Sequence, residues 1–370
     1  MGGLYRAQAY CYGVFDLNMT SIIPTISNHV FASKSLTGKY CLSPFVMVEV
    51  EVNGNIRLCG CGAWQPITVG NLFQNSLKDI LSSEKASAVR QSIIDGTYHF
   101  CNEKMCGVIA NDELNTIDTV PPEVKKLLAD SSKFQMPNYI SIQGDEVCNL
   151  SCPSCRPKVI KPDIRELESK NKLAKIMHDN LFSIPTDQII TLHVSGSGEV
   201  FASPFLLKMV SSIDLVKFPN TKLCLQTNGL LAPRKWHHFQ HLESVISHVV
   251  VSIDAATADT YEYLRRGGKW EQLNNAMTFL QQKKQQIGFE LRTRMTVQDR
   301  NADEILQFYE FSKSFNTDRI EYTKIDNWWW TTEYYQHQNV FDPSHKKYNN
   351  VIQQLSEVRK LPGVWLHGLL

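Results

Sequence analysis

The sequence has no excess of charge of either sign. Its 370 residues include 38 lysines and arginines and 37 aspartates and glutamates, which gives a formal net charge of +1. A balance this close produces no long-range field that would attract nucleic acid or an anionic membrane surface. We therefore expect no nucleic acid and no membrane among the partners of the chain.

Long apolar runs are also missing. The sequence contains no run of about 18 apolar residues, so no membrane-spanning helix is expected. The first ten residues, MGGLYRAQAY, lack the basic and apolar stretches of a secretory signal peptide. Since 43% of the residues are apolar and 20% are charged, the chain can bury a sizeable core. We predict a cytoplasmic protein of two domains, or of one large domain with an appendage.

Cysteine, in contrast, is abundant and clustered. Ten cysteines in a reducing compartment are not expected to form disulfides, and clusters of them indicate metal sites. The first group consists of Cys41, Cys59, Cys61, Cys101 and Cys106, and the second of Cys148, Cys152 and Cys155, whereas Cys11 and Cys224 stand apart.

Prolines mark a connector between the two cysteine groups. Pro122 and Pro137 lie in a polar stretch, and the residues before prolines favour extended structure. The predicted limits are 1–135 for an N-terminal domain, 136–330 for a second domain, and 331–370 for a C-terminal segment that covers one opening.

The second domain alternates short apolar runs with helical patterns, of which Leu273, Ala276, Met277 and Leu280 are an example. Strands separated by helices favour an α/β fold with a parallel sheet, either open or closed into a partial barrel. In both cases the chemistry gathers at the carboxyl ends of the strands. The predicted strands are 139–143, 189–194, 222–227, 248–253, 289–295 and 319–325.

The second cysteine group lies in the segment GDEVCNLSCPSCR, directly after the first of these strands. A structural zinc site, like a simple iron–sulfur electron carrier, normally needs four protein ligands, and no fourth cysteine or histidine is nearby in the sequence. Three thiolates on a four-iron cube would leave one iron open to a small molecule. The alternatives are a zinc ion with a distant fourth ligand such as His193, or cysteines that are merely buried.

This C-x3-C-x2-C segment resembles the cluster motif of the radical S-adenosylmethionine (SAM) superfamily. Further elements of that family follow on successive predicted strand ends, and their order supports the resemblance. They are GSGE at 196–199, Thr227-Asn228-Gly229, Ser252 ahead of Asp254, and YLRRGGKW at 263–270.

The resemblance implies a partial (β/α)6 barrel over residues 139–325. Cys148, Cys152 and Cys155 would bind a 4Fe–4S cluster whose open iron holds SAM, and reduction would cleave SAM to methionine and a 5′-deoxyadenosyl radical. Ser154 replaces the aromatic residue that commonly precedes the third cysteine, so adenine must pack elsewhere. The implied SAM-binding residues are Ser197, Gly198, Glu199, Asn228, Ser252 and Arg266, with Arg265 as the alternative to Arg266.

The first cysteine group surrounds a predicted hairpin. Residues 45–59 alternate as in strands around an Asn53-Gly54 turn, which would bring Cys41 and Cys59 to the same end. Helical stretches follow around 74–94, and then Cys101 and Cys106. Four cysteines from two approaching segments suit either a tetrahedral zinc ion or a fully ligated iron–sulfur cluster.

The spacing from Cys41 to Gly54 to Cys59 resembles the opening of the auxiliary-cluster domains called SPASM and twitch. Those domains usually follow the barrel, whereas this one would precede it as a small α+β domain. The resemblance implies a second 4Fe–4S cluster bound by Cys41, Cys59, Cys101 and Cys106, with Cys61 as a spare or alternative ligand. A cluster with four thiolates has no open iron, which favours electron transfer or a structural role.

Cys224 and several charged side chains of the second domain are further candidates for functional residues. Cys224 is either a buried core residue or a lumen-facing thiol that donates a hydrogen atom to a substrate radical. Charged and polar residues on the last two strands are predicted to contact substrate from the lumen, and these are Arg292, Arg294, Glu321, Tyr322 and Lys324.

The family resemblance implies an enzyme that abstracts hydrogen from a ribosomally made peptide, leading to epimerisation, cross-linking or backbone excision. The expected partners are a precursor peptide, a separate small leader-recognition protein and an external electron donor, either flavodoxin or ferredoxin. One alternative is a dehydrogenase or epimerase of a sugar or cyclitol. The other is a non-catalytic metal-binding scaffold.

Overall fold

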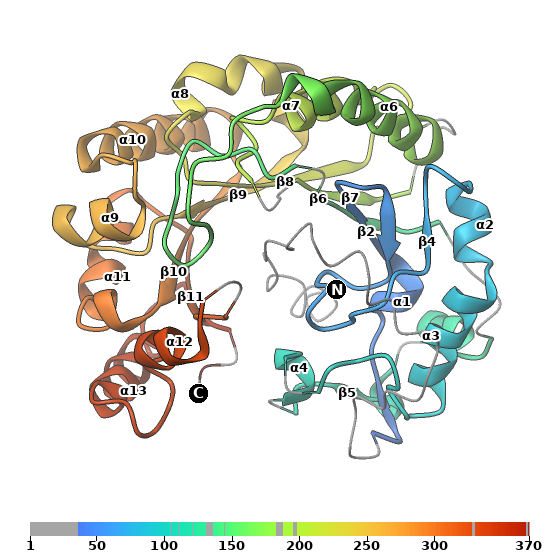
Figure 1. Ribbon diagram of the computed structural model, residues 1–370, viewed down its shortest axis with the longest axis horizontal. Coiled ribbons are helices and arrows are strands. Elements are labelled where there is room, and N and C mark those ends of the chain that lie inside the picture. Colours follow the sequence, from blue (N-terminus) through green and yellow to red (C-terminus); the bar gives the residue numbers. More distant parts are fainter. Residues whose placement is uncertain are drawn as a thin grey trace. The chain divides into compact units, whose positions relative to one another are not determined.

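The computed structural model of the chain divides into two compact units (Figure 1). The first comprises the described residues before 144 together with Ile164–His193 and Ser212–Thr221, and the second comprises Asp145–Asp163, Val194–Ser211 and the residues from 222 onward. The structure describes residues 36–103, 105–110, 112–120, 122–130, 136–143, 145–182, 188–194, 198–327, 330–367 and 369. The predicted domain limits are not tested by this division and stay a prediction.

The first unit mixes short strands and helices. Pro44 occupies the first turn of a short helix, where the missing N–H costs nothing, so residues 43–46 are helical where the sequence pattern predicts strand from residue 45. Its elements are β1 (Lys39–Tyr40), α1 (Ser43–Val46), β2 (Met47–Glu51), β3 (Asn55–Arg57), β4 (Gly70–Asn71), α2 (Leu77–Leu81), α3 (Glu84–Ile94), α4 (Gly107–Ala110), β5 (Asn115–Thr116), η1 (Ile117–Thr119), α5 (Pro122–Leu128), β6 (Tyr139–Gln143), α6 (Ile164–Leu181) and most of β7 (Ile190–Val194).

The hairpin predicted around Asn53-Gly54 is confirmed. Strands β2 and β3 are antiparallel, with Val50 opposite Ile56, and Gly54 adopts a φ of 80° that the turn requires. On its other edge β2 pairs in parallel with β6, with Val48 opposite Ile140. The strand order in this unit is therefore β7-β6-β2-β3-β4, while β1 and β5 form a separate two-stranded sheet.

The second unit is built around parallel strands in the order β12-β11-β10-β9-β8. Figure 1 shows helices α8 to α11 on one side of strands β8 to β11. Its elements are α7 (Pro204–Ser211), β8 (Thr221–Thr227), α8 (Ala232–Lys235), η2 (Trp236–Val245), β9 (Ile246–Ser252), α9 (Ala258–Leu264), α10 (Trp270–Ile287), β10 (Glu290–Val297), η3 (Asp299–Asn301), α11 (Ile305–Ser314), β11 (Arg319–Lys324), α12 (Thr332–Gln338), α13 (Tyr348–Val358) and β12 (Val364–Leu366).

Strand β10 shows how the two faces of this sheet differ. Leu291, Met295 and Val297 are buried and alternate with polar residues, as expected where one face packs against helices. On the helix face, the Thr293 hydroxyl donates to Ser312 of α11 at 2.9 Å. The opposite face carries charge, because Arg294 lies on it.

The predicted fold class is confirmed, because the chain is α/β. In the sequence a small N-terminal α+β domain comes first, and the partial (β/α)6 barrel pattern follows from β6 to β11. All six predicted barrel strands are present, with ends that differ by at most two residues from those predicted. Within the described residues no helix is long and apolar enough to cross a membrane.

Candidate functional site

Four cysteines of the first unit line one cavity. Cys41 directly follows β1, Cys59 lies two residues beyond β3, and Cys101 and Cys106 lie between α3 and α4. The hairpin accounts for the first two, since antiparallel pairing brings the start of β2 beside the end of β3. The structure therefore brings together the four residues that the sequence predicts as ligands of an auxiliary cluster.

Buried contacts hold the segments that carry these cysteines. The Arg90 side chain on α3 is almost fully buried and donates to the carbonyl oxygens of Pro44 at 3.1 Å and Leu81 at 2.8 Å. Beyond α3, the Tyr98 N–H donates to the Ser92 carbonyl, and the Cys101 N–H donates to the Tyr98 carbonyl, both at 2.8 Å. These bonds fix the turn that leads to Cys101.

Burial shapes the acidity of all four thiols. It raises the pKa of Cys41, Cys59 and Cys101, and it raises the pKa of Cys106 to about 12. Around Cys59, charge on the other three cysteines is the next cause that raises the pKa. Each thiol therefore keeps its proton at neutral pH unless a cationic centre replaces it.

The spacing of the sulfurs distinguishes between two kinds of cationic centre. Sulfurs around one zinc ion lie about 3.8 Å apart, because each Zn–S bond is about 2.3 Å long. No three cysteine sulfurs in the described part of the chain lie within 4.8 Å of one another. As they stand in the structure, the four thiols do not form the compact tetrahedron of one zinc ion. Cys61, the alternative ligand, is not among the residues that line the cavity. It is disulfide-bonded, so the expectation that the cysteines form no disulfides is wrong at this residue.

Two polar side chains that line the same cavity also suit a sulfur-rich group. The Gln65 side chain makes a hydrogen bond to Cys101. Tyr98 is completely buried, and its hydroxyl has no hydrogen-bond partner among the described residues. Burial raises the pKa of Tyr98, and charge on neighbouring cysteines raises it further, so the hydroxyl stays protonated.

In the second unit the other three cysteines lie on the loop between β6 and α6. The N–H groups of Cys155 and Arg156 both donate to the Cys152 carbonyl at 2.9 Å, which closes a tight turn. The Arg156 side chain donates to the Glu146 carbonyl and, at 3.4 Å, to the Cys155 sulfur. Burial raises the pKa of Cys152 and, with help from the charge of a neighbouring glutamate, raises the pKa of Cys148 to about 12.

The segment after β7 packs directly on this loop. The Glu199 N–H donates to the Val147 carbonyl at 2.8 Å. A Cβ atom on Gly198 would lie 2.4 Å from the Val147 carbonyl oxygen and 2.8 Å from that of Asp145. Only glycine can approach the loop backbone so closely. Ser197, the third SAM-binding prediction in this segment, lies outside the described residues.

The Glu199 carboxylate joins this segment to the end of β8. It accepts hydrogen bonds from the Thr227 hydroxyl at 2.5 Å and from the Asn228 N–H at 2.6 Å. The Asn228 side chain in turn donates to Asn149 of the cysteine loop at 3.0 Å. Two of the predicted SAM-binding residues, Glu199 and Asn228, thus belong to one buried network that reaches the loop.

The two arginines after α9 also contact the cysteine loop, in different ways. Arg266 donates to the carbonyl oxygens of Ser151 and Pro157, each at 3.0 Å, and so braces the loop backbone. Arg265 is more deeply buried, with its guanidinium 2.8 Å from Asp254 and 3.8 Å from the Cys152 sulfur.

Comparison with known proteins bears on the region of the first cysteine group. Residues 41–107 match the SPASM family, an iron-sulfur cluster-binding domain. A GTP 3′,8-cyclase of Lactiplantibacillus plantarum is 25% identical over 214 residues, which cover 55% of this chain and 60% of the relative. The chain is a radical SAM protein with an N-terminal SPASM domain. The unusual position of the SPASM domain, ahead of the barrel, is confirmed.

The curated relatives of this radical SAM protein match it only in part. A second GTP 3′,8-cyclase, from Listeria welshimeri, is 24% identical over 196 residues, which cover 51% of this chain and 55% of the relative. The chain thus spans less than two thirds of the length of these relatives.

Two solved structures resemble the radical SAM protein weakly. Streptococcus suis SuiB bound to precursor peptide SuiA matches with a TM-score of 0.40 at 13% identity, over 76% of this chain and 62% of SuiB. Native anSMEcpe with bound AdoMet matches with a TM-score of 0.42 at 16% identity, over 61% of this chain and 63% of that one. Likeness at this level does not bear on substrate or mechanism.

Ser252 ends strand β9 of the radical SAM barrel, two residues before Asp254. Asp254 adopts a φ of 67°, which is unusual for a residue other than glycine. Its carboxylate accepts from the Thr296 N–H at 2.7 Å and pairs with Arg265, and its carbonyl accepts from Asn301 at 2.8 Å. Asp254 is therefore fixed from three sides, and it fixes the end of the strand that carries Ser252.

Cys224 lies on β8, opposite His248 of β9 in the strand register. Its side chain is buried, and burial raises the pKa of the thiol to about 12. The thiol therefore keeps its hydrogen at neutral pH. Both interpretations of Cys224, as a core residue and as a hydrogen-atom donor, require a protonated thiol.

The charged residues of the last barrel strands divide between the two faces of the sheet. On one face, Arg294 of β10 pairs with Glu321 of β11 at 2.6 Å and donates to Gln226 of β8 at 2.9 Å, across the intervening strand β9. Tyr322 points the other way, since its hydroxyl donates to the Ile305 carbonyl of α11 at 2.9 Å. The prediction that Tyr322 faces the lumen is wrong, because residues of alternating position on a strand face opposite sides.

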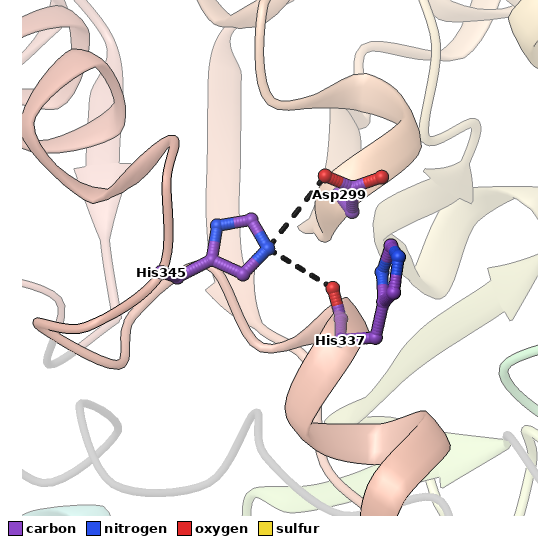
Figure 2. A group of neighbouring side chains, drawn as sticks. All are labelled: Asp299, His337 and His345. Atoms are coloured by element: carbon purple, nitrogen blue, oxygen red, sulfur yellow. Dashed lines mark hydrogen bonds and ion pairs between the residues drawn. The ribbon is translucent and has the colours of Figure 1, made fainter.

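A third group of potential metal ligands does not fit a metal. Asp299, His337 and His345 place one donor atom each within 4.8 Å of one another (Figure 2). His345 Nδ1 accepts from the Lys347 N–H at 3.2 Å, so Nε2 carries the proton that it donates to the His337 carbonyl at 3.0 Å. The Lys347 ammonium lies 3.8 Å from the Asp299 carboxylate. A protonated ring nitrogen and a nearby ammonium both oppose cation binding.

Several residues of these sites were not predicted from the sequence. Tyr98 and Gln65 line the SPASM cavity, and Arg156 braces the barrel loop, but no spacing or motif distinguishes them. Arg156 directly follows the last cysteine, which was the one available signal.

Proposed function

We propose that this chain is a radical SAM enzyme that abstracts a hydrogen atom from a ribosomally made peptide. One observation carries the catalytic half of the proposal. The three-cysteine loop contacts the ends of strands β7 and β8 and the turn after α9, through Gly198, Asn228 and Arg266. In the sequence these elements are the motifs that resemble the SAM-binding elements of the superfamily.

These contacts suggest a separate role for each group of residues. Cys148, Cys152 and Cys155 hold a 4Fe–4S cluster with one iron open to SAM. When bound, the cluster supplies one electron for cleavage of SAM to methionine and a 5′-deoxyadenosyl radical. Burial of the surrounding side chains excludes water, which would otherwise compete with substrate for a reactive species.

Around that cluster, Gly198, Glu199, Asn228, Ser252 and Arg266 are proposed to form the SAM site, together with Ser197. The Asn228 N–H donates to the Glu199 carboxylate, and Arg266 holds the loop backbone, so these three act chiefly by positioning. Cys224 is proposed to return a hydrogen atom to a substrate carbon radical. The thiyl radical that remains would need one electron and one proton from outside.

The SPASM domain supports the peptide half of the proposal, because the resemblance links such domains to peptide-modifying enzymes. Cys41, Cys59, Cys101 and Cys106 are proposed to hold a second 4Fe–4S cluster, which relays electrons or stabilises the domain. A flavodoxin or ferredoxin is the proposed external electron donor. A separate small protein is proposed to recognise the leader of the precursor peptide.

Iron analysis tests the two clusters. After anaerobic reconstitution the chain should hold about eight irons and eight sulfides, because each cube contains four of each. The variant with Cys148, Cys152 and Cys155 all replaced by alanine should retain about four irons, all of them in the SPASM domain. Zinc without sulfide in that variant would refute the second cluster.

A nucleotide is the second candidate substrate, because two GTP 3′,8-cyclases match about half of this chain. The two proposals separate in one assay. Reconstituted enzyme with SAM and reductant would be incubated either with GTP or with short peptides encoded beside its gene. Mass change of a peptide with no consumption of GTP is expected, and the reverse result would refute the peptide proposal.

The same assay tests the leader-recognition protein. Addition of small proteins encoded in the same neighbourhood should increase peptide modification. Modification of a full-length precursor at full rate by the isolated chain would show that no such partner is needed.

A further inference from the structure

The Tyr98 hydroxyl is a buried hydrogen-bond donor without an acceptor. Tyr98 has no exposed surface, and its hydroxyl bonds to no described atom. Leaving a buried polar group unsatisfied destabilises the folded protein. A phenylalanine would fill the same space without that cost, so the structure gives the hydroxyl no role in the apoprotein.

The backbone at Tyr98 is also strained. Its φ of 48° lies in the left-handed region, which an aromatic residue rarely adopts. Two hydrogen bonds hold it there, from the Tyr98 N–H to Ser92 and from the Cys101 N–H to the Tyr98 carbonyl. Strain of this kind persists where the surrounding structure fixes a side chain in a functional direction.

Tyr98 lines the cavity of the SPASM domain together with Cys41, Cys59, Cys101 and Cys106. None of the four cysteine sulfurs accepts a hydrogen bond from the Tyr98 hydroxyl, even at the longer distances that sulfur allows. The missing acceptor therefore belongs to whatever fills the space between the cysteines. A 4Fe–4S cube held by the four cysteines would supply sulfide ions as acceptors.

We propose that the Tyr98 hydroxyl donates a hydrogen bond to a sulfide of the SPASM cluster and thereby raises its reduction potential. Hydrogen bonds to cluster sulfurs stabilise the reduced, more negatively charged state. Gln65 already provides such a bond to the Cys101 sulfur. Tyr98 would be the second donor, and the one that contacts the inorganic part of the cluster. This inference rests on the cluster proposed for the SPASM domain.

The test compares Tyr98→Phe with its parent in the full-length chain that lacks Cys148, Cys152 and Cys155, so that only the SPASM cluster contributes a signal. Redox titration followed by electron paramagnetic resonance gives the midpoint potential. We expect about a tenfold loss in the reduction equilibrium constant, which lowers the potential by about 59 mV for one electron. Iron and sulfide content should be unchanged.

Tyr261→Phe is the matched control, since Tyr261 is another fully buried tyrosine whose hydroxyl has no described partner, but it lies beside the barrel loop. It should leave the potential of the SPASM cluster unchanged. An unaltered or higher potential in Tyr98→Phe would overturn the inference while leaving the cluster in place. Loss of iron from Tyr98→Phe alone would overturn it too, because the hydroxyl would then serve assembly. A parent protein without iron and sulfide would overturn the cluster and the inference together.

Discussion

Replacement of Cys148, Cys152 and Cys155 by alanine should reduce the release of 5′-deoxyadenosine from SAM under dithionite to the background level. The three thiolates hold the proposed cluster at the loop that contacts Gly198, Asn228 and Arg266, and no other described group could replace them there. Cys101→Ala should retain SAM cleavage, because the proposed SPASM cluster, with four thiolate ligands, would have no open iron for SAM. The measurement is anaerobic chromatography of the nucleoside product.

Cys148→Ala alone is the sharper version of this experiment. It removes one ligand and leaves the loop contacts of Asn149 and Ser151 unchanged in chemical type. Release of 5′-deoxyadenosine at the parental rate from Cys148→Ala would show that the barrel loop does not bind the SAM-cleaving cluster. Loss of the activity in Cys101→Ala as well would mean that both cysteine sites are needed for cleavage.

Gly198→Ala should destroy the barrel site by a purely steric route. The new Cβ would lie 2.4 Å from the Val147 carbonyl oxygen, directly before Cys148, and 2.9 Å from the Glu146 carbonyl carbon. Both neighbours are backbone atoms, so relief requires the cysteine loop itself to move. We expect a loss of about 1–3 kcal/mol in stability, as for other overpacked sites, together with loss of the barrel cluster.

Gly288→Ala provides the control for that experiment. Gly288 ends α10 with a φ of 81°, and a Cβ there would meet no atom within 4 Å. Its cost is therefore conformational, about 1 kcal/mol, and iron content should stay at the parental level. Thermal unfolding gives the stability of both variants, and iron analysis gives their clusters. Full iron content in Gly198→Ala would show that the loop adapts to the extra methyl group.

The sequence predicted the barrel well because short strand-like runs alternate with helical patterns along the chain. A strand that is buried on both faces carries consecutive apolar residues, as Val249, Val250 and Val251 of β9 do, and such a run can be recognised from the sequence alone. The cysteine spacing predicts two candidate sites for a related reason. Ligands of one metal group must meet within a few ångströms, so short loops that carry several of them are recognisable.

Contacts between distant segments were not predictable in the same way. Glu199 carries a recognisable motif, but nothing in the sequence shows that its carboxylate binds Thr227 and the Asn228 backbone. The left-handed backbone conformation of Tyr98 could not be predicted from the sequence, because glycine or asparagine usually occupies positions with a positive φ. The face on which Tyr322 lies depended on strand register, which a mixed polar and apolar strand does not define.

The parallel pairing of β2 with β6 has a consequence for how the chain is made. The ribosome releases the SPASM hairpin long before residues 139–143, which form β6. During synthesis the edge of β2 that later pairs with β6 therefore has unpaired backbone N–H and C=O groups. An exposed edge of this kind attracts other strands, and nascent chains would gain from a chaperone at that stage. A fragment cut after residue 135 would keep the same open edge permanently and is expected to aggregate.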